Sequence, residues 1–413
     1  MSGAHESLFD TRCCIVGGGP AGIVLGLLLA RAGVSVMVLE KHGDFLRDFR
    51  GDTVHPSTLE LLRDIGLLDK FLALPHRREE TLLASFADGL VTIGDFRGLQ
   101  PFPFLALVPQ WDFLDLLATE SRRYPSHRLL MDTQATALLR EDGRVVGVQA
   151  QGPHGPLTVR ADLVVACDGR HSTLREAAGL KTRDFGAPMD VLWFRLPREA
   201  ADLDNTFGIV ARGSMMVVVN RDDYWQLGLL IPKGSGEARR RRPIAEFHAE
   251  VARIAPFLAG RMREIKSWND VSLLTVTVDR LERWHQRGLL LIGDAAHAMS
   301  PIGGVGINLA IQDAIATANI VGPALRDGGP IGDGLLAKVQ ARRLLPTRII
   351  QAVQVAAQRR VIDAILSPEG PPPRLPGLAR SLLKFRWVRR IPARLFGLGV
   401  RRERLRLTAT AVR

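Results

Sequence analysis

The 413-residue chain is poor in cysteine and has no long apolar run. Its three cysteines, Cys13, Cys14 and Cys167, fall in apolar segments that predict buried strands, so we expect neither disulfides nor metal ligands. The most apolar run, residues 21–30, is shorter than a membrane span. Residues 1–11 are polar and acidic, unlike a secretory signal peptide. We therefore expect a cytoplasmic protein.

Acidic residues are almost missing from the C-terminal segment. From Arg374 to Arg413 the chain has twelve basic residues and one acid, Glu403, which gives this segment a net charge of +11. The whole chain carries +12, so the remainder is nearly neutral. The high charge therefore gives no argument for a nucleic-acid partner. The length and the apolar content of 46% predict a globular body of two domains.

The most informative segment that is present is a glycine-rich run, GGGPAG, at residues 17–22. It follows a predicted buried strand over 12–16 and opens a predicted helix over 23–32. A second predicted strand ends at Glu40. Strand, glycine run, helix, strand and acid in this order are typical of a dinucleotide-binding βαβ unit.

Each part of this unit has a physical purpose. Gly17 allows a tight turn, Gly19 lets the backbone approach a pyrophosphate, and Gly22 lets the helix pack closely on the strand. The helix N-terminus offers unpaired N–H groups to phosphates, and Glu40 is placed to accept from a ribose hydroxyl. A plain glycine turn is the alternative, but it leaves the acid at the strand end unexplained. Only one such fingerprint is present, so we expect no second dinucleotide domain.

Two further motifs follow predicted strands. They are DGRHSTLR at residues 168–175 and GDAAHAMSPIGGVGIN at residues 293–308. Together with GGGPAG, they resemble the single-component aromatic hydroxylases of the para-hydroxybenzoate hydroxylase fold. These are FAD-dependent monooxygenases that use NADH or NADPH, and the resemblance covers residues from about 11 to 365.

The resemblance implies an α/β fold with a Rossmann-like FAD-binding domain built on a parallel sheet. A mostly antiparallel sheet domain would bind the substrate, and a helical segment would end the chain. We expect the FAD-binding domain over residues 1–75, 102–180 and 275–366, the substrate domain over 76–101 and 181–274, and a basic tail over 367–413.

The resemblance and the chemistry of the motifs together assign the FAD contacts. Asp294 follows a buried strand, where open α/β sheets bind ligands, although a helix cap is its alternative role. Arg170 and Arg175 could supply charge to phosphates; for Arg175, a part in a capped turn is equally open. The expected cofactor-binding residues are Gly17, Gly19, Pro20, Ala21, Gly22, Glu40, Lys41, Arg50, Gln110, Asp168, Gly169, Gly293, Asp294, Gly304, Gly306, Ile307 and Asn308.

Tyrosine is also scarce, and this bears on catalysis. Only Tyr124 and Tyr224 are present, so we expect no tyrosine network that deprotonates a phenol. Either the substrate needs no deprotonation, or His55 or Asp52 performs it. His55 could instead contact the substrate, attach the flavin, or be an ordinary capping or core histidine. The expected catalytic residues are His55, Asp52 and Pro301; His297 is expected to be structural.

The expected sheet over residues 191–231 could form a dry wall beside the flavin. Its candidate substrate contacts are Trp193, Arg195, Met215 and Trp225. The resemblance implies that NADH or NADPH reduces FAD, and that a flavin hydroperoxide then hydroxylates or epoxidises an aromatic or polyketide-like molecule. A quinone-like or alkaloid substrate fits equally well. The alternatives are an FAD-dependent reductase or dehydrogenase that does not use dioxygen, and a non-catalytic flavin-binding protein.

The basic tail allows two interpretations. Residues 382–396 mix arginine with Trp, Phe and Leu, a composition that suits a short helix on an anionic membrane surface. It equally suits a helix folded back on the body with its arginines directed outward. Both remain open at this point, and the sequence does not predict an oligomeric state.

Overall fold

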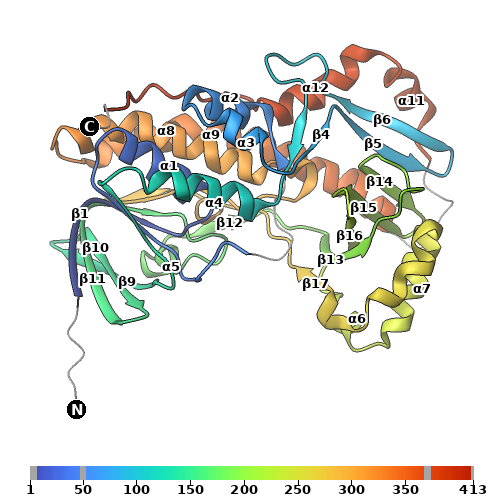
Figure 1. The fold of residues 1–413 in the computed structure, drawn as a ribbon, viewed down its shortest axis with the longest axis horizontal. Coiled ribbons are helices and arrows are strands. Elements are labelled where there is room, and N and C mark those ends of the chain that lie inside the picture. The colour runs from blue at the N-terminus through green and yellow to red at the C-terminus, as the bar shows by residue number, and fades with distance from the viewer. Residues whose placement is uncertain (1–6, 47–52, 367–373, 411–413) are drawn as a thin grey trace.

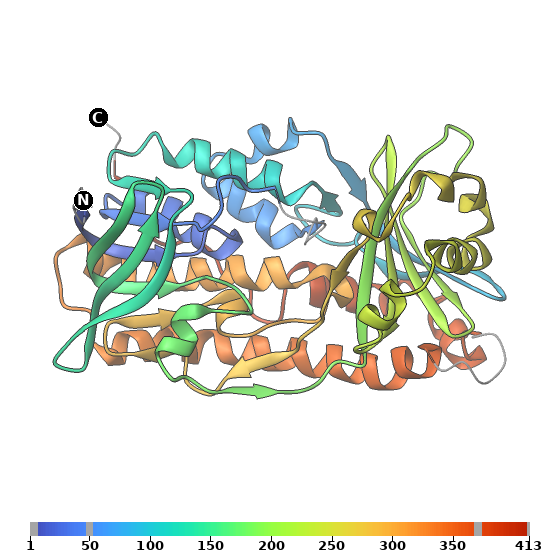
Figure 2. The same ribbon diagram turned by 90° about the horizontal axis from the view of Figure 1, so that it is seen from below.

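The computed structural model describes residues 7–46, 53–366 and 374–410. Two large sheets lie at opposite ends of the long axis, as Figures 1 and 2 show. The long helices α8 (Gly306–Arg326) and α9 (Asp333–Ala357) run between them. This arrangement confirms the predicted fold class.

The first sheet has eight strands, with the order β19-β20-β11-β1-β2-β8 and with β10 and β9 attached through β11. The pairs β20-β11, β11-β1, β1-β2 and β2-β8 are parallel. Buried apolar residues on both faces of these strands explain their nearly continuous apolar sequences. The strands are β1 (Ser7–Val16), β2 (Val36–Leu39), β8 (His127–Leu130), β9 (Gln134–Glu141), β10 (Arg144–Gly152), β11 (Gly155–Ala166), β19 (His285–Gln286) and β20 (Leu289–Leu291).

The second sheet has seven strands in the order β17-β13-β16-β15-β14-β5-β6. All of its pairs are antiparallel except β14-β5. One face packs on α7 (Ile244–Ile254) and the 3-10 helix η1 (Pro256–Glu264). The strands are β5 (Thr81–Phe86), β6 (Gly89–Asp95), β13 (Met189–Pro197), β14 (Phe207–Ala211), β15 (Ser214–Asn220), β16 (Tyr224–Pro232) and β17 (Ser272–Leu274).

Smaller elements join the two sheets. Strands β3, β7 and β4 form one small sheet, and β12 pairs with β18. Their bounds are β3 (Thr53–Val54), β4 (Arg77–Glu79), β7 (Leu105–Leu107), β12 (Thr182–Asp184) and β18 (Asp279–Leu281). The shorter helices are α1 (Pro20–Arg31), α2 (Pro56–Asp64), α3 (Leu68–Leu72), α4 (Gln110–Ser121), α5 (Thr173–Ala177), α6 (Gly236–Arg240), η2 (Trp268–Asp270), η3 (Gly293–Ala295) and η4 (Ile302–Gly304).

The sequence predicts two further helices, over 243–259 and 335–366, and both differ from the observed ones. The first ends at Ile254, because Pro256 disfavours helical backbone before it and starts η1 instead. The second is α9 followed by a π-helical turn, η5 (Gln358–Ile362), and by α10 (Asp363–Leu366).

The expectation that no stretch reaches the length of a membrane span needs correction. Residues Ile302–Arg326 are long and apolar enough to cross a bilayer by length and composition. However, 72% of the relevant window is buried inside the protein. Helix α8 is therefore apolar because it packs on the first sheet and against α1 and α9.

The tail folds back on the body. Helix α12 (Arg386–Gly397) lies beside β6, where Ala393 packs among Phe96, Leu99 and Leu105. Helix α11 (Gly377–Leu382) is held by an ion pair between Arg380 and Asp88. The chain then returns along α8 and reaches α1. The structure therefore shows the tail in contact with the body, which is the second of the two interpretations.

Candidate active site

The carboxyl ends of four parallel strands meet at one edge of the first sheet. Val16 is in register with Leu39 on one side and with Ala166 on the other, and Ala166 is in register with Leu291. The next residues in each chain segment are those of the three motifs and Glu40. Since ligands of open α/β sheets bind beyond these strand ends, this edge is the candidate site.

The glycines of the first motif leave room where a phosphate would lie. Gly17 has a φ of 107°, and an added Cβ would lie 2.3 Å from the carbonyl oxygen of Cys167. An added Cβ at Gly22 would lie 1.9 Å from the carbonyl oxygen of Gly17. At Gly19, by contrast, an added Cβ would meet no atom within 4 Å. Gly19 is the N-cap residue of α1, so the N-terminus of this helix faces that open space.

Glu40 holds the glycine turn against the second strand. Its Oε2 accepts the backbone N–H of Gly18 at 2.7 Å, and its Oε1 accepts that of His42 at 3.1 Å. Its Oε1 also lies 2.6 Å from His42 Nδ1. Lys41 is exposed directly after Glu40, and Gln110 begins α4 in a half-buried position.

The second motif shapes its own turn. Asp168 accepts from Ser172 Oγ at 2.5 Å and from the N–H of Leu174 at 3.2 Å. Burial raises the pKa of Asp168, and these hydrogen bonds and the charge of Arg175 oppose that rise. Arg175 donates to the carbonyls of Ala295 and Arg170, so it ties the second motif to the third. Gly169, with a φ of 83°, leaves open space beside the turn.

Asp294 is loosely held in comparison. Its Oδ2 lies 3.9 Å from an Arg170 nitrogen, and its side chain is 36% exposed. Arg170 is anchored by a 3.0 Å hydrogen bond to the carbonyl of Thr275. A half-exposed carboxylate with one distant cation is free to accept a hydroxyl, as expected for a ribityl contact.

The glycine loop of the third motif is fastened to the start of α2. His55 Nε2 donates to the carbonyl of Gly304 at 3.1 Å. Ser57 and Thr58 donate to Asn308 Oδ1 at 2.9 and 2.8 Å, while Asn308 Nδ2 is buried without a partner among the described residues. The loop begins at Pro301, and Gly306 and Ile307 open α8.

His55 is 1% exposed. Burial lowers its pKa to about 4, against the carbonyls of Gly304 and Phe396, which raise it. It is therefore neutral at pH 7, with its Nε2 proton engaged by the loop. The ring of Phe396, from the tail, would lie 3.4 Å from a Cβ at Gly303. The tail therefore touches the same loop as His55.

These observations fit FAD. The open space at Gly19 suits a pyrophosphate, Asp294 suits a polyol, and the unpaired Asn308 amide provides a buried donor at the N-terminus of α8. Two expected site residues, Arg50 and Asp52, lie outside the described residues.

Sequence reasoning missed a buried ionic chain behind the third motif. Asp313 of α8 accepts from the N–H of Gly293 at 3.1 Å, pairs with His297 at 2.6 Å and pairs with Arg343 at 2.8 Å. Arg343 also lies 3.3 Å from Glu403 of the tail. Burial raises the pKa of Asp313, but the pairs with His297 and Arg343 hold it below its ordinary value. A single acid in an apolar helix was the available signal.

The second sheet presents an apolar face to the glycine loop. Trp193 and Met215 pack in one cluster with Ile302 of the loop, and the buried Trp193 Nε1 has no partner among the described residues. Arg195, on the same strand, is exposed to solvent.

The expectation for Trp225 needs correction. Trp225 is fully buried on the opposite face, in the cluster with Phe194 and α7, and its Nε1 donates to Asp202 at 2.9 Å. It is directly across from Leu196, and residues opposite each other on neighbouring strands share a face. Trp225 therefore belongs to the core beneath α7.

Comparison with known proteins identifies relatives over most of the chain. The model of the FAD binding domain family matches residues 10–353. The 6-methylpretetramide 4-monooxygenase of Streptomyces rimosus is 36% identical over 367 residues, which cover 87% of this chain and 85% of that protein.

Solved structures show the same architecture. The OxyS anhydrotetracycline hydroxylase from Streptomyces rimosus has a TM-score of 0.72 and 26% identity, covering 94% of this chain and 76% of that one. The p-nitrophenol 4-monooxygenase PnpA from Pseudomonas putida DLL-E4 has a TM-score of 0.76 and 20% identity, covering 94% and 97% of the two chains. The second similarity shows a shared fold.

Proposed function

The chain belongs to the FAD binding domain family and is an FAD-dependent monooxygenase, and from this premise we propose that it hydroxylates a polycyclic aromatic molecule of the polyketide type. The relative with 36% identity is named for such a reaction on 6-methylpretetramide. These relatives favour oxygen transfer over the reductase and non-catalytic alternatives.

The apolar face around Trp193 is the observation that supports this substrate class best. Trp193 and Met215 pack against the same apolar cluster as Ile302 of the glycine loop, and the only polar atom of the Trp193 side chain is a buried donor without a partner among the described residues. A flat aromatic molecule with a carbonyl or hydroxyl oxygen would cover the surface and accept from Nε1. A small, strongly polar substrate would leave the apolar surface unsatisfied.

We propose that the strand-end residues hold FAD. Gly17, Gly19 and Gly22 with Pro20 and Ala21 would bind the pyrophosphate at α1, and Glu40 the ribose. Asp294 would accept from the ribityl chain. The loop from Pro301 to Asn308 would contact the ring system, with Gly304 and Gly306 allowing close approach. The chemistry that FAD supplies when bound is hydride uptake from NADH or NADPH and transfer of one oxygen atom from dioxygen.

We propose that His55 is a positioning residue. Its Nε2 proton is engaged by the Gly304 carbonyl, and its pKa of about 4 keeps the ring neutral at pH 7. It therefore fixes the glycine loop at α2, and Pro301 directs the start of that loop. The dry environment around Trp193 and Ile302 would exclude water from the reacting groups.

We also propose that the two sheets correspond to two domains. The eight-stranded sheet with α1, α8 and α9 would be the FAD-binding domain, and the seven-stranded sheet with α7 the substrate domain. Separate apolar clusters support this division.

The function is tested with FAD-loaded protein, NADPH, dioxygen and an anhydrotetracycline-type aromatic polyketide. We expect substrate-dependent NADPH oxidation and a product heavier by one oxygen atom, labelled when ¹⁸O₂ is used. If NADPH reduces the flavin but the aromatic polyketide is recovered unchanged, the proposed substrate class is wrong. A Trp193→Phe variant should raise KM, because it removes the donor and keeps the apolar surface.

We further propose that the outer face of the tail contacts an anionic membrane surface. Leu378, Trp387 and Ile391 are 76%, 63% and 57% exposed, although their helices are docked on the body. Lys384 and Arg386 lie among them. Exposed apolar side chains between cations suit the headgroup region of an anionic bilayer.

This surface is tested by sedimentation with vesicles of phosphatidylglycerol and phosphatidylcholine at low salt. We expect binding by the full chain and its loss in a Trp387→Ser, Ile391→Ser double variant. Leu203→Ser is the matched control, because Leu203 is 62% exposed outside the tail. Absence of binding by the unaltered protein overturns the proposal.

A further inference from the structure

The end of α9 and the first residue of η5 carry three buried glutamines. Gln351, Gln354 and Gln358 are spaced three and four residues apart, so they lie on one side of the helix. Each of them is at most 2% exposed. We call these three residues the glutamine row. Buried amide groups are almost always hydrogen-bonded, so the partners of the row show what it holds.

Every member of the glutamine row reaches residues 298–302, where the third motif leads into the glycine loop. Gln351 Nε2 donates to the carbonyl of Ala298 at 3.1 Å and also to that of Asp279 at 2.7 Å. Gln358 Nε2 donates to Ser300 Oγ at 2.9 Å. The row therefore lies along this segment and contacts it at several points.

Gln354 holds the chain on both sides of Pro301. Its Nε2 donates to the carbonyl of Ser300 at 3.0 Å and to that of Ile302 at 2.8 Å. Both partners are carbonyl oxygens, so only the amide nitrogen, which has two N–H groups, can satisfy them. Pro301 has no backbone N–H of its own with which to fix this position. A single side chain thus spans the proline at which the glycine loop begins.

These contacts are made at a cost in stability. Gln354 Oε1 and Gln358 Oε1 are buried without a hydrogen-bond partner among the described residues. A buried amide oxygen that lacks a hydrogen bond raises the free energy of the folded state. Such costs are typical of places where a fold fixes a functional group, and they argue against a role in stability alone.

The same helix end also contacts the apolar face of the second sheet. Val355 of α9 and Ile362 of η5 pack in one cluster with Trp193 and with Ile302 of the glycine loop. The turn η5 is π-helical, a form often found at functional sites. One helix end therefore holds the loop by hydrogen bonds from Gln354 and the apolar face by packing.

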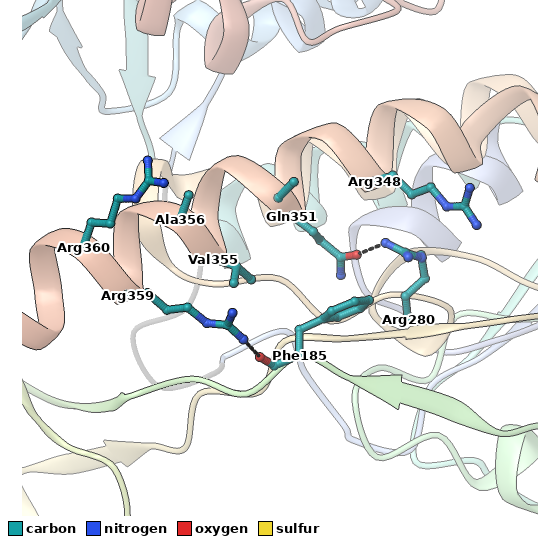
Figure 3. Close-up of a pocket in the computed structure, with 9 residues that line it drawn as sticks. Phe185, Arg280, Arg348, Gln351, Val355, Ala356, Arg359 and Arg360 are labelled. Atoms are coloured by element: carbon teal, nitrogen blue, oxygen red, sulfur yellow. Dashed lines mark hydrogen bonds between the residues drawn. The ribbon is translucent and has the colours of Figure 1, made fainter.

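On its other side, the helix is fastened away from the strand ends. Gln351 Oε1 accepts from Arg280 at 2.7 Å, beside a cavity of about 440 Å³ that Figure 3 shows. The Arg280 guanidinium lies 4.8 Å from the centre of the Phe185 ring, and Arg359 donates to the Phe185 carbonyl at 3.4 Å. These contacts tie α9 and η5 to the segment after β12, so Gln354 extends from a fixed helix.

We propose that Gln354, assisted by Gln358, is a positioning residue that sets where the segment around Pro301 lies against the ring system of FAD. This inference rests on the proposed function, in which the loop from Pro301 to Asn308 contacts that ring system. Reduction adds negative charge to the ring system, and the N-terminus of α8 at the end of this loop carries positive partial charge. A loop held by Gln354 keeps this charge in place and thereby favours reduced FAD.

The test compares Gln354→Met with the unaltered protein. Methionine has a similar length and no N–H group, so the substitution removes both hydrogen bonds with little change in volume. We expect reduced FAD to lose about ten times more affinity than oxidised FAD, which lowers the two-electron reduction potential by about 30 mV. Anaerobic equilibration with a redox dye measures the potential, and titration of the apoprotein measures the affinity for oxidised FAD.

Gln340→Met is the matched control. Gln340 also belongs to α9, and its Nε2 donates to the carbonyl of Glu282 at 2.8 Å while its Oε1 accepts from the N–H of Trp284 at 3.0 Å. These partners belong to the segment between β18 and β19, not to the glycine loop. We expect this variant to lower the thermal stability and to leave the potential unchanged. An equal fall in potential in both variants would reveal a general loosening of α9 and overturn the proposal.

An unchanged potential in a Gln354→Met protein that binds FAD also overturns it. If that variant does not fold, Gln358→Met decides the question, because it removes only the hydrogen bond to Ser300. A smaller fall in potential then supports the proposal, and no change overturns it. The proposed function fails in a different way, namely if the unaltered, FAD-loaded protein oxygenates no aromatic polyketide, whatever the potential of the Gln354 variant.

Discussion

Helix α9 and its continuation η5 carry two groups of arginines in opposite surroundings. Arg343 is fully buried and lies between two carboxylates, at 2.8 Å from Asp313 and 3.3 Å from Glu403. Arg348, Arg359 and Arg360 face a cavity and have no ion pair among the described residues. Arginines along the same helix therefore lie in two different environments.

The difference between the two groups separates structure from binding. The buried group of Asp313, Arg343 and Glu403 joins three segments. Asp313 accepts from Gly293 of the third motif, Arg343 belongs to α9, and Glu403 belongs to the tail, so this group fixes the tail on the body. Arg348, Arg359 and Arg360 join no segments through an ion pair among the described residues, and the charge of Arg348 helps to lower the pKa of Arg280. Pairing decides which arginines support the fold.

The largest expected effect is at the paired site. Arg343→Met should lower the free energy of unfolding by about 3–5 kcal/mol, because it leaves the buried Asp313 without its guanidinium partner, whereas Glu403 keeps its pair with Arg342. Urea denaturation followed by circular dichroism measures this. Arg342→Met is the control; Arg342 is partly exposed and should cost less than about 1 kcal/mol. If both substitutions lower the free energy of unfolding equally, the distinction between the buried Arg343 and the partly exposed Arg342 is contradicted.

Acid titration distinguishes the contribution of the Asp313–Arg343 ion pair to stability from that of two buried histidines. Burial lowers the pKa values of His55 and His127 to about 4, so between pH 6.5 and 4 the unfolded chain binds more protons than the folded chain. Stability is thus complete near pH 7 and falls on acidification, by about 3 kcal/mol per histidine at most. The pKa of Asp313 is held low, so its pair with Arg343 stays intact over this range.

His55→Gln should therefore remove about half of the fall between pH 6.5 and 4, measured as the midpoint of urea unfolding. Gln retains a donor for the Gly304 carbonyl, so stability at pH 7 should change little. A fall as steep as in the unaltered protein would show that His55 takes up a proton without cost.

The smallest expected effect is at the unpaired site and has the opposite sign. Arg348→Gln should raise the free energy of unfolding by a few tenths of a kcal/mol, roughly the size of a screened surface interaction, because it relieves repulsion with Arg280. Differential scanning calorimetry without nucleotide, in low salt, measures it. A loss of stability would mean that Arg348 has a structural role.

Much of the candidate site was predictable because its signals are local. The glycine run, the second motif and the third motif each follow a strand, and parallel strands bring their carboxyl ends to one edge. For the same reason the sequence predicts a helix from Ile307, one residue after the observed start of α8. The backbone conformation at these places depends on glycine and on strand ends, which the sequence displays directly.

The sequence was less able to predict on which face of a sheet a residue lies and which distant residues it contacts. Trp193 and Trp225 both lie in strands, yet one faces the glycine loop and the other faces α7. Alternation fixes which residues share a face within a strand, but not which face meets the flavin side. Two adjoining cavities beside α9 are lined by residues from β12, β18, α9 and η5, and no local pattern in the sequence connects these segments.

The sequence by itself determined the βαβ unit, the positions of the three motifs and the fold class, because hydrophobic period and glycine placement act over a few residues. Only the tertiary structure decided that the tail docks on the body through Glu403, that Asp313 supports Gly293, and that the arginines of α9 divide into paired and unpaired groups. The physical reason is that charges and hydrogen bonds take their effect from the groups that they meet, and distant segments meet only when the chain is folded.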